Sequence, residues 1–348
     1  MADRSNWLGL SVGRLLFTST MSRLRLRRVT AVCAWVTMVV AAACGRTDDA
    51  AYEFALFGDN PYRPENVPRV EALVEDVNRR GDLEWVIHVG DTKGGGQPCT
   101  DEFLRGRFEL YQRFSIPFVF TPGDNDWFDC VRPGAGARDE YERLGFIRSL
   151  YFPDPGSTTG GRPMATRSQS AGSDYSEFVE NVLWTHGGVV YATIHLLGLG
   201  REPTDPEVAT RRMNAALTWI RTAFSEARES GSVGVFLATQ VDPWIVWGLP
   251  SLVRQRCAAC LEPRPGLEEL YPLLVEESDS FPGQVVLAVG DTHIFRVDKP
   301  LYRTDATLVE NFTRVETFGD PDVHWVRVRV DPRERSVFSF YQELVPEG

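Results

Sequence analysis

The chain has 348 residues, the composition of an ordinary globular protein and a formal net charge of −11 at pH 7. Its length allows one large domain or two small ones. The only lysines are Lys93 and Lys299, and no basic stripe runs through the body of the sequence, which excludes nucleic-acid binding through phosphate contacts.

The first 43 residues have the pattern of a secretory signal peptide. Arginines at 23–28 precede an apolar run that ends in small residues, and this run is too short to cross a bilayer comfortably. Met21 is a plausible true start, in which case residues 1–20 are not part of the protein. The sequence predicts export to the bacterial cell envelope, on the periplasmic or outer surface.

The signal-like segment closes with AAAC-G, which resembles the lipobox of bacterial lipoproteins. Ala41 stands where that motif usually has Leu. We expect lipid attachment at Cys44, which would be the protein's only link to the membrane; a cleaved signal with an incidental Cys is the alternative. Residues 44–51 are expected to be a short tether.

Beyond the tether, short apolar runs alternate with amphipathic helical patterns, and residues 52–348 are predicted to form one domain. Such alternation is typical of an α/β fold. The last strands are expected to be antiparallel and to make the fold mixed. Strands are expected at 52–58, 84–91, 117–124, 187–198, 232–240, 284–291, 315–319, 324–331 and 336–343, and helices at 65–80, 101–114, 139–152, 209–229 and 266–277.

Polar side chains follow the predicted strands at a recurring position. Four strands end in Gly-Asp pairs, Gln240 ends a fifth, and His293 follows two residues after the last Asp. Ligands of open α/β sheets bind beyond the carboxyl ends of the strands, so we expect these residues at one edge of one sheet. The four aspartates are Asp59, Asp91, Asp124 and Asp291.

Four carboxylates that converge in a site repel one another unless a counter-charge is present. Divalent cations with oxygen ligands are the ordinary solution, and Gly before each Asp permits a sharp turn. A single Gly-Asp pair is more often a plain turn, which is how we interpret Gly81-Asp82 and Gly319-Asp320. The pattern therefore predicts a metal site.

With these motifs in order, the sequence resembles the calcineurin-like metallophosphoesterases. That family carries five blocks at strand ends, and the corresponding segments here read DNP, GDTK, GDND, a lone Gln and GDTH. The resemblance implies an αββα sandwich with mixed sheets. It implies a metal-dependent phosphoesterase that cleaves phosphate mono- or diesters by attack of metal-bound water or hydroxide.

The resemblance also implies the ligands of one or two metals. The first metal would take Asp59, Asp91 and His293, but Pro61 stands where the family has a His. The second would take Asp91, Asp124, Gln240 and Asp291, an oxygen-only set. Such donors predict Mg²⁺, Mn²⁺, Ca²⁺ or Fe rather than Zn²⁺.

The catalytic histidine of the third block is replaced by Asn125. An amide can hydrogen-bond a phosphate oxygen but cannot act as a general acid near neutral pH. We assign catalytic roles to Asn125, which would orient the phosphate, and to Asp91, which would bridge two metals. The alternative is a non-catalytic lipoprotein of this fold that binds a metal or a partner through its acidic residues.

The remaining cysteines suggest disulfides, because an exported protein is oxidised. Cys99 and Cys130 each follow a Gly-Asp loop, and a bridge between them is expected. Cys257 and Cys260 form a CxxC for which a local structural disulfide is favoured over zinc or redox chemistry. Among the histidines, His88 is expected in the core, and His195 is considered either as a packed residue or as a proton donor.

Overall fold

The computed structural model describes residues 50–198, 204–244 and 266–346. The chain divides after Arg46, and the fold described below is that of the part beginning at Thr47. The predicted signal peptide, Cys44, Cys257 and Cys260 lie outside the described residues. Among the helices that are described, none combines the length and apolarity needed to cross a membrane.

The elements alternate much as the sequence predicts. The strands that build the two sheets are β1 (Tyr52–Phe57), β2 (Leu83–His88), β3 (Pro117–Phe120), β4 (Thr159–Gly160), β5 (Arg167–Ser168), β6 (Val182–His186), β7 (Val189–Thr193), β8 (Gly234–Ala238), β9 (Gln284–Val289), β10 (Arg296–Asp298), β11 (Phe312–Glu316), β12 (Trp325–Val330) and β13 (Phe338–Glu343). The α-helices are α2 (Val67–Arg80), α3 (Asp101–Tyr111), α4 (Glu140–Tyr151), α5 (Pro206–Ser230) and α6 (Leu270–Ser280).

Helix boundaries follow the local chemistry. In α5, the side chain of Asp205 accepts hydrogen bonds from the backbone N–H groups of Glu207 and Val208, Pro206 occupies the first turn, and Gly231 ends the helix in a left-handed conformation. These are the expected start and stop signals. Helix α2 buries an apolar stripe at helical spacing, namely Val70, Leu73, Val74 and Val77.

The strands form two sheets. One has the order β13-β12-β1-β2-β3-β4 and the other the order β10-β11-β9-β8-β7-β6-β5. Within them, β1 pairs parallel with β2 and β2 with β3, while β7 pairs parallel with β8 and β8 with β9. The expectation of a single sheet edge was therefore wrong, because the predicted site residues follow strands of both sheets.

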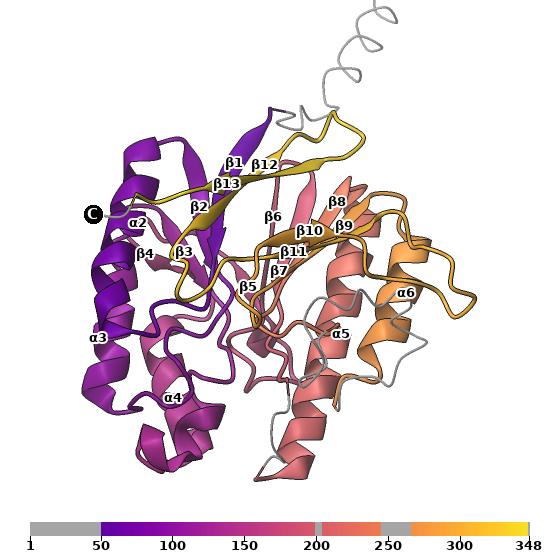
Figure 1. Ribbon diagram of the computed structural model, residues 1–348. Helices are drawn as coiled ribbons and strands as arrows, with labels where there is room; N and C mark the ends of the chain where they lie inside the picture. The colour runs from indigo at the N-terminus through magenta and orange to yellow at the C-terminus, as the bar shows by residue number, and fades with distance from the viewer. Residues whose placement is uncertain (1–49, 199–203, 245–265, 347–348) are drawn as a thin grey trace, which may run out of the picture. The chain divides into compact units, whose positions relative to one another are not determined.

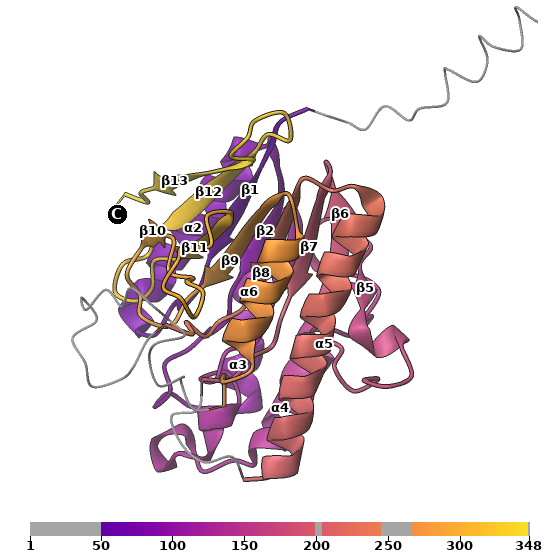
Figure 2. The same ribbon diagram turned by 90° about the vertical axis from the view of Figure 1, so that its right-hand side faces the viewer.

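The two sheets pack face to face, with helices on their outer faces, as in the αββα sandwich that the sequence predicts. Alternate residues of β1 explain this arrangement. Ala55 and Phe57 point to the cluster under α2, α3 and α4, whereas Phe54 and Leu56 enter the core between the sheets. Figures 1 and 2 show α5 and α6 on the opposite outer face, where they pack on β7, β8 and β9.

The topology differs from the sequence prediction in two respects. Strands β4, β5, β6 and β10 were not predicted. Strand β11 was expected to be antiparallel together with the two last strands. It is antiparallel to β10 but parallel to its other neighbour, β9, so β12 and β13 alone form the antiparallel extension next to β1.

Candidate functional site

Six side chains at the strand ends form what we call the acidic rim: Asp59, Asp91, Asp124, Gln240, Asp291 and His293. Three come from loops after β1, β2 and β3 of the first sheet, and three from loops after β8 and β9 of the second. Several of them have left-handed backbone conformations that non-glycine residues seldom adopt, with φ of 52° at Asp59, 57° at Asp91 and 82° at Asp291. Such backbone strain clusters at functional sites.

Asp59 and Asp91 lie side by side at the centre of the acidic rim. The Gln240 amide nitrogen donates to both, at 3.3 Å from Asp59 Oδ1 and 3.0 Å from Asp91 Oδ2. The backbone N–H of Asp291 lies 3.2 Å from Asp59 Oδ2. Both carboxylates are almost completely shielded from solvent. The structure thus brings the ends of the two sheets together at one point.

Glycine permits this close approach. A Cβ at position 123 would lie 2.0 Å from Asp91 Oδ1, and one at position 290 would lie 2.0 Å from Asp59 Oδ2. Those distances are far below van der Waals contact. Gly123 and Gly290 therefore make room for the carboxylate of another Gly-Asp pair, in addition to allowing the chain to turn.

The electrostatics of the acidic rim are strongly unfavourable without a counter-charge. Burial raises the pKa of Asp59 well above its ordinary value, and the nearby Asp291 carboxylate raises it further. Burial likewise raises the pKa of Asp91, with contributions from Asp124 and Asp59. Asp124 acts on Asp91 through its charge. Asp59, Asp91, Asp124 and Asp291 thus influence one another through their charges.

Asn125 holds Asp91 in place. Its backbone N–H donates to Asp91 Oδ1 at 3.0 Å, and its side-chain nitrogen donates to Asp91 Oδ2 at 2.8 Å and to the Tyr62 hydroxyl at 3.1 Å. Both hydrogens of the amide therefore serve protein groups. In this arrangement Asn125 positions Asp91, in contrast to the predicted role of presenting its amide to a phosphate.

Asp126 organises the loops around Asp91. Its carboxylate accepts hydrogen bonds from the N–H groups of Asp91, Thr92 and Gly123, at 2.8–2.9 Å, and from the Thr92 hydroxyl at 2.6 Å. It is completely buried. Asp126 thus braces the loops after β2 and β3 against each other.

Lys93 lies in the loop after β2, near the carboxylates of Asp126 and Asp91. Its side chain is fully buried. Its ammonium donates to the carbonyl oxygen of Gly94 at 3.2 Å. Burial lowers its pKa, while the carboxylates of Asp126 and Asp91 oppose that effect. Lys93 is therefore buried among the acids and offsets part of their charge.

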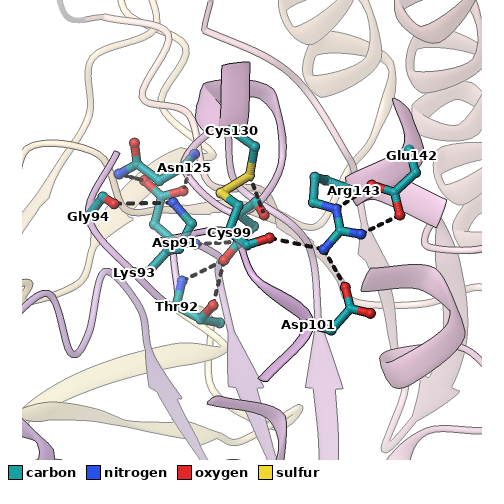
Figure 3. The surroundings of a disulfide bond; sticks show 11 residues. Asp91, Thr92, Lys93, Gly94, Cys99, Asp101, Asn125, Cys130, Glu142 and Arg143 are labelled. Carbon is teal, nitrogen blue, oxygen red and sulfur yellow. Dashed lines mark hydrogen bonds and ion pairs between the residues drawn. A yellow bond between two sulfur atoms is a disulfide. The ribbon is translucent and has the colours of Figure 1, made fainter. Parts of the chain in front are cut away.

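The predicted disulfide between Cys99 and Cys130 is present, with a Cα–Cα distance of 5.6 Å (Figure 3). Arg143 lies against it and donates to the carbonyl oxygen of Cys99 at 2.9 Å and to Asp101 at 2.6 Å. The bond connects the segment after Asp91 to the segment after Asp124. It thereby fixes two loops of the acidic rim relative to each other.

Replacing both cysteines by Ala is expected to lower the free energy of unfolding by about 3–4 kcal/mol, since the bond closes a loop across a sequence separation of 31 residues. Urea unfolding of the oxidised protein and of the double variant measures this difference. Wild-type protein treated with a reductant is the matched control and should behave like the variant. Equal midpoints and slopes for all three would contradict the prediction.

His88 lies beneath the Asp91 loop and is fully buried, as expected for a core residue. Its Nδ1 accepts a hydrogen bond from the Gly90 N–H at 3.0 Å. Burial lowers its pKa from 6.5 to about 3. The folded protein therefore holds this imidazole neutral at pH values where the unfolded chain would protonate it.

This difference predicts a loss of stability in acid. Between pH 6.5 and 3 the unfolded state binds a proton at His88 that the folded state does not, so the His88 contribution falls by about 2 kcal/mol from pH 7.5 to 5. His88→Asn keeps an acceptor for Gly90 and does not titrate. Urea unfolding at both pH values should show a steeper loss for the wild type than for H88N, and parallel losses would refute the assignment.

His195 follows β7 and packs against Trp127 of the loop after β3. Its Nδ1 lies 2.8 Å from Glu180 Oε1, and its Nε2 accepts a hydrogen bond from the Trp127 indole at 3.1 Å. Burial and the neighbouring Arg212 lower its pKa to about 4. Both ring nitrogens are engaged inside the protein, so the packed role is the one that its contacts support.

Sequence reasoning missed two residues of the site. Tyr62 places its hydroxyl 3.2 Å from Asp59 Oδ1 and 3.1 Å from Asp91 Oδ2. Asp320, which we expected to be an ordinary turn residue, accepts a hydrogen bond from the Tyr62 N–H at 3.0 Å, and its carbonyl oxygen lies 2.6 Å from His293 Nδ1. Tyr62 could have been noticed as a hydroxyl-bearing residue three positions after Asp59.

Acidic and imidazole groups alone do not complete a metal site in the ranges 50–198, 204–244 and 266–346. No three His, Cys, Asp or Glu side chains there are grouped so that they could hold a metal ion. The hydroxyl of Tyr62 and the amide of Gln240 both contact Asp59 and Asp91. Tyr62 and Gln240 therefore lie against the two central carboxylates.

Several solved structures are similar to this chain at low identity. GAP50, the anchor in the inner membrane complex of Plasmodium, is 10% identical with a TM-score of 0.46 over 85% of this chain and 90% of its own. A dimetal phosphatase from Danio rerio is 11% identical with a TM-score of 0.47 over 85% and 99%. Purple acid phosphatase PPD1 from yellow lupin is 12% identical with a TM-score of 0.47 over 86% and 54%. No conclusion about activity rests on such distant similarities.

The curated proteins include no match to the sequence. A family model described as calcineurin-like phosphoesterase matches residues 52–253, which is more than half of the chain. The match includes the loops after β1, β2, β3 and β8. The chain therefore belongs to the calcineurin-like phosphoesterase family.

Proposed function

We propose that this protein is a phosphoesterase that hydrolyses a phosphate mono- or diester with the help of a divalent cation held at the acidic rim. The family is typically dependent on two metal ions. The observation that carries the proposal is the buried pair Asp59 and Asp91, which the loops of two sheets surround with further acids.

The donors of the acidic rim are of the types that a cation preferring oxygen takes, although in the described residues no three of its acidic and imidazole side chains are grouped around one point. Burial and nearby carboxylates raise the pKa values of Asp59 and Asp91. Lys93 offsets only part of the negative charge of these acids. His293 adds a nitrogen donor, with its Nε2 3.7 Å from Asp59 Oδ1. This set favours Mg²⁺, Mn²⁺ or Ca²⁺, and a site with Fe is compatible with it, whereas Zn²⁺ prefers sulfur and imidazole.

The residues of the chain have distinct tasks in this proposal. Asp59, Asp91 and His293 would hold the first cation, and Asp91, Asp124, Gln240 and Asp291 a second. Asn125 fixes the orientation of Asp91 through two hydrogen bonds. Asp126 accepts hydrogen bonds from the backbone N–H groups of Asp91 and Gly123 and so fixes the loops after β2 and β3. A cation bound there supplies Lewis acidity and a lowered pKa for a coordinated water.

The alternative is a non-catalytic member of the family that binds a cation or a partner through the acidic rim. One observation favours it: Asn125 stands in the place of the family's catalytic His, and both hydrogens of its amide are used within the protein. A phosphoesterase of this kind would need a substrate whose leaving group requires little protonation.

We also propose that the protein is exported and lipid-anchored at Cys44. The support is the signal-like segment of the sequence together with the disulfide in the described part of the chain, since disulfides persist in oxidising compartments. Mass spectrometry of the protein purified from membranes tests this proposal, because a diacylglyceryl mass on Cys44 supports it and an unmodified or absent Cys44 in soluble protein overturns it.

Cation binding and ester hydrolysis separate the two functions. Protein treated with EDTA should gain stability on addition of Mn²⁺, Mg²⁺ or Ca²⁺, by about 2.7 kcal/mol at a hundredfold excess over the dissociation constant. The same samples are assayed with p-nitrophenyl phosphate and bis-p-nitrophenyl phosphate. Hydrolysis that requires the cation supports the phosphoesterase.

Two other outcomes are informative. Stabilisation by a cation without hydrolysis of either ester, or of a wider panel of phosphate esters, favours the binding protein. No stabilisation by any of the cations refutes the metal-dependent function in both forms. Zn²⁺, which binds most nitrogen and oxygen sites more tightly than Mn²⁺ does, serves as the comparison ion.

A further inference from the structure

The loop after β1 carries Tyr62 into the centre of the acidic rim. The Tyr62 backbone N–H donates to Asp320 Oδ2 at 3.0 Å, which anchors the residue. Its ring meets the His293 ring edge to face at a centroid distance of 4.9 Å, and a Cβ at position 94 would touch the ring at 3.4 Å. Tyr62 is thus held between two loops with its hydroxyl directed at the acids.

The surroundings of the Tyr62 hydroxyl create a conflict among acceptors. The oxygen lies 3.2 Å from Asp59 Oδ1 and 3.1 Å from Asp91 Oδ2. A hydroxyl has one proton to donate, so one of these two contacts brings oxygens together with no Tyr62 proton between them. The Asn125 amide donates to the hydroxyl at 3.1 Å and therefore occupies one of its lone pairs without resolving the conflict.

His293 lies at the same place. Its Nδ1 lies 2.6 Å from the carbonyl oxygen of Asp320, which can only accept, so Nδ1 carries a proton. Its other ring nitrogen, Nε2, lies 3.7 Å from Asp59 Oδ1. Asp320 thus orients both Tyr62 and His293, as partners behind metal ligands commonly do.

A hard cation bound between these oxygens would resolve the conflict at the Tyr62 hydroxyl. Neighbouring oxygens in the coordination shell of a small divalent cation lie about 3 Å apart, which is the spacing of the Tyr62 hydroxyl from the two carboxylates. The family's histidine ligand of the first block is absent, because Pro61 occupies its position. The next residue along the chain is Tyr62.

We infer that the phenolic oxygen of Tyr62 is a ligand of the first cation position, together with Asp59, Asp91 and His293, and replaces the histidine that Pro61 cannot supply. The inference rests on the proposed cation binding. It assigns three oxygens and one nitrogen to this position, and it selects for a hard cation such as Mn²⁺ or Mg²⁺.

Titration of metal-free protein with Mn²⁺ tests the inference by equilibrium affinity and stoichiometry, independently of any ester hydrolysis. Tyr62→Phe removes only the oxygen, and Tyr341→Phe removes the same atom from an exposed tyrosine of β13. We expect Y62F to bind Mn²⁺ at least about 10-fold more weakly than the wild type, and Y341F to bind like the wild type.

Tyr62→His restores a donor atom and should bind more tightly than Y62F, which guards against a general effect of altering the loop. Melting temperatures without metal show whether the variants are folded. If the wild type binds Mn²⁺ and Y62F binds it equally or more tightly, the hydroxyl is not a ligand. That result overturns the inference about Tyr62 and leaves the proposed cation binding intact. A wild type that binds no Mn²⁺ refutes the proposed function and the inference together.

Discussion

Asp91→Asn is expected to abolish the response of the protein to divalent cations while raising its stability in their absence. Asp91 is buried beside like charges, and its pKa is raised by burial and by Asp124 and Asp59, so removal of its charge relieves repulsion. The same change removes a central ligand, which should weaken cation binding on the order of 100-fold or more. Few mechanisms other than cation binding predict these opposite signs.

Melting temperatures with and without Mn²⁺ measure both effects in one experiment. Asp82→Asn is the matched control, because Gly81-Asp82 is the same dipeptide at the exposed end of α2 and should respond like the wild type. A D91N variant with an undiminished Mn²⁺ shift would exclude Asp91 as a ligand. A variant less stable than the wild type without cations would contradict the electrostatic account.

Asp126→Ala is expected to cost about 3–6 kcal/mol of unfolding free energy, a large part of the total for a typical domain. It leaves the N–H groups of Asp91, Thr92 and Gly123 without the acceptor that they now share, at about 1–3 kcal/mol for each buried unsatisfied donor. The loss of one negative charge beside Asp91 offsets part of this cost.

Urea unfolding gives the magnitude, and Asp126→Asn provides the graded comparison. The Asn variant keeps one acceptor oxygen and removes the charge, so we expect it to lie between the wild type and D126A. A D126A protein within about 1 kcal/mol of the wild type would mean that water or a rearranged loop satisfies the freed N–H groups. In that case Asp126 would not be the brace of this site.

The parts of the fold that were predicted correctly depend on local patterns. The apolar stripe of α2 and the Gly-Asp pairs at strand ends require only near neighbours in the sequence, and the disulfide could be predicted from the positions of Cys99 and Cys130 after such pairs. The division of the strands between two sheets could not be predicted from such patterns, because a buried strand such as β8 has the same pattern in either sheet.

The site was incompletely predicted for a related reason. Asp59 and Asp91 can be recognised from the glycine that precedes each of them. Tyr62 and Asp320 cannot be recognised in this way, because the hydrogen bond between them joins residues 258 positions apart in the sequence. Asn125 was identified by its position but not by its partners, since only the folded structure shows that its amide hydrogens are engaged. Sequence patterns identify candidate donors, and tertiary packing decides which of them meet.

The acidic rim draws its members from both sheets, and this has a mechanical consequence. Asp91 and Asp59 end strands of one layer, and Gln240 and Asp291 end strands of the other. A ligand that binds all four residues would hold the two layers together at one end of the sandwich. In the absence of a ligand, the carboxylates of Asp59, Asp91 and Asp291 repel one another there. Binding of a ligand at the acidic rim would therefore slow amide hydrogen exchange in β8 and β9 as well as in β1 and β2. A local binding event would thus change how readily the whole sandwich opens.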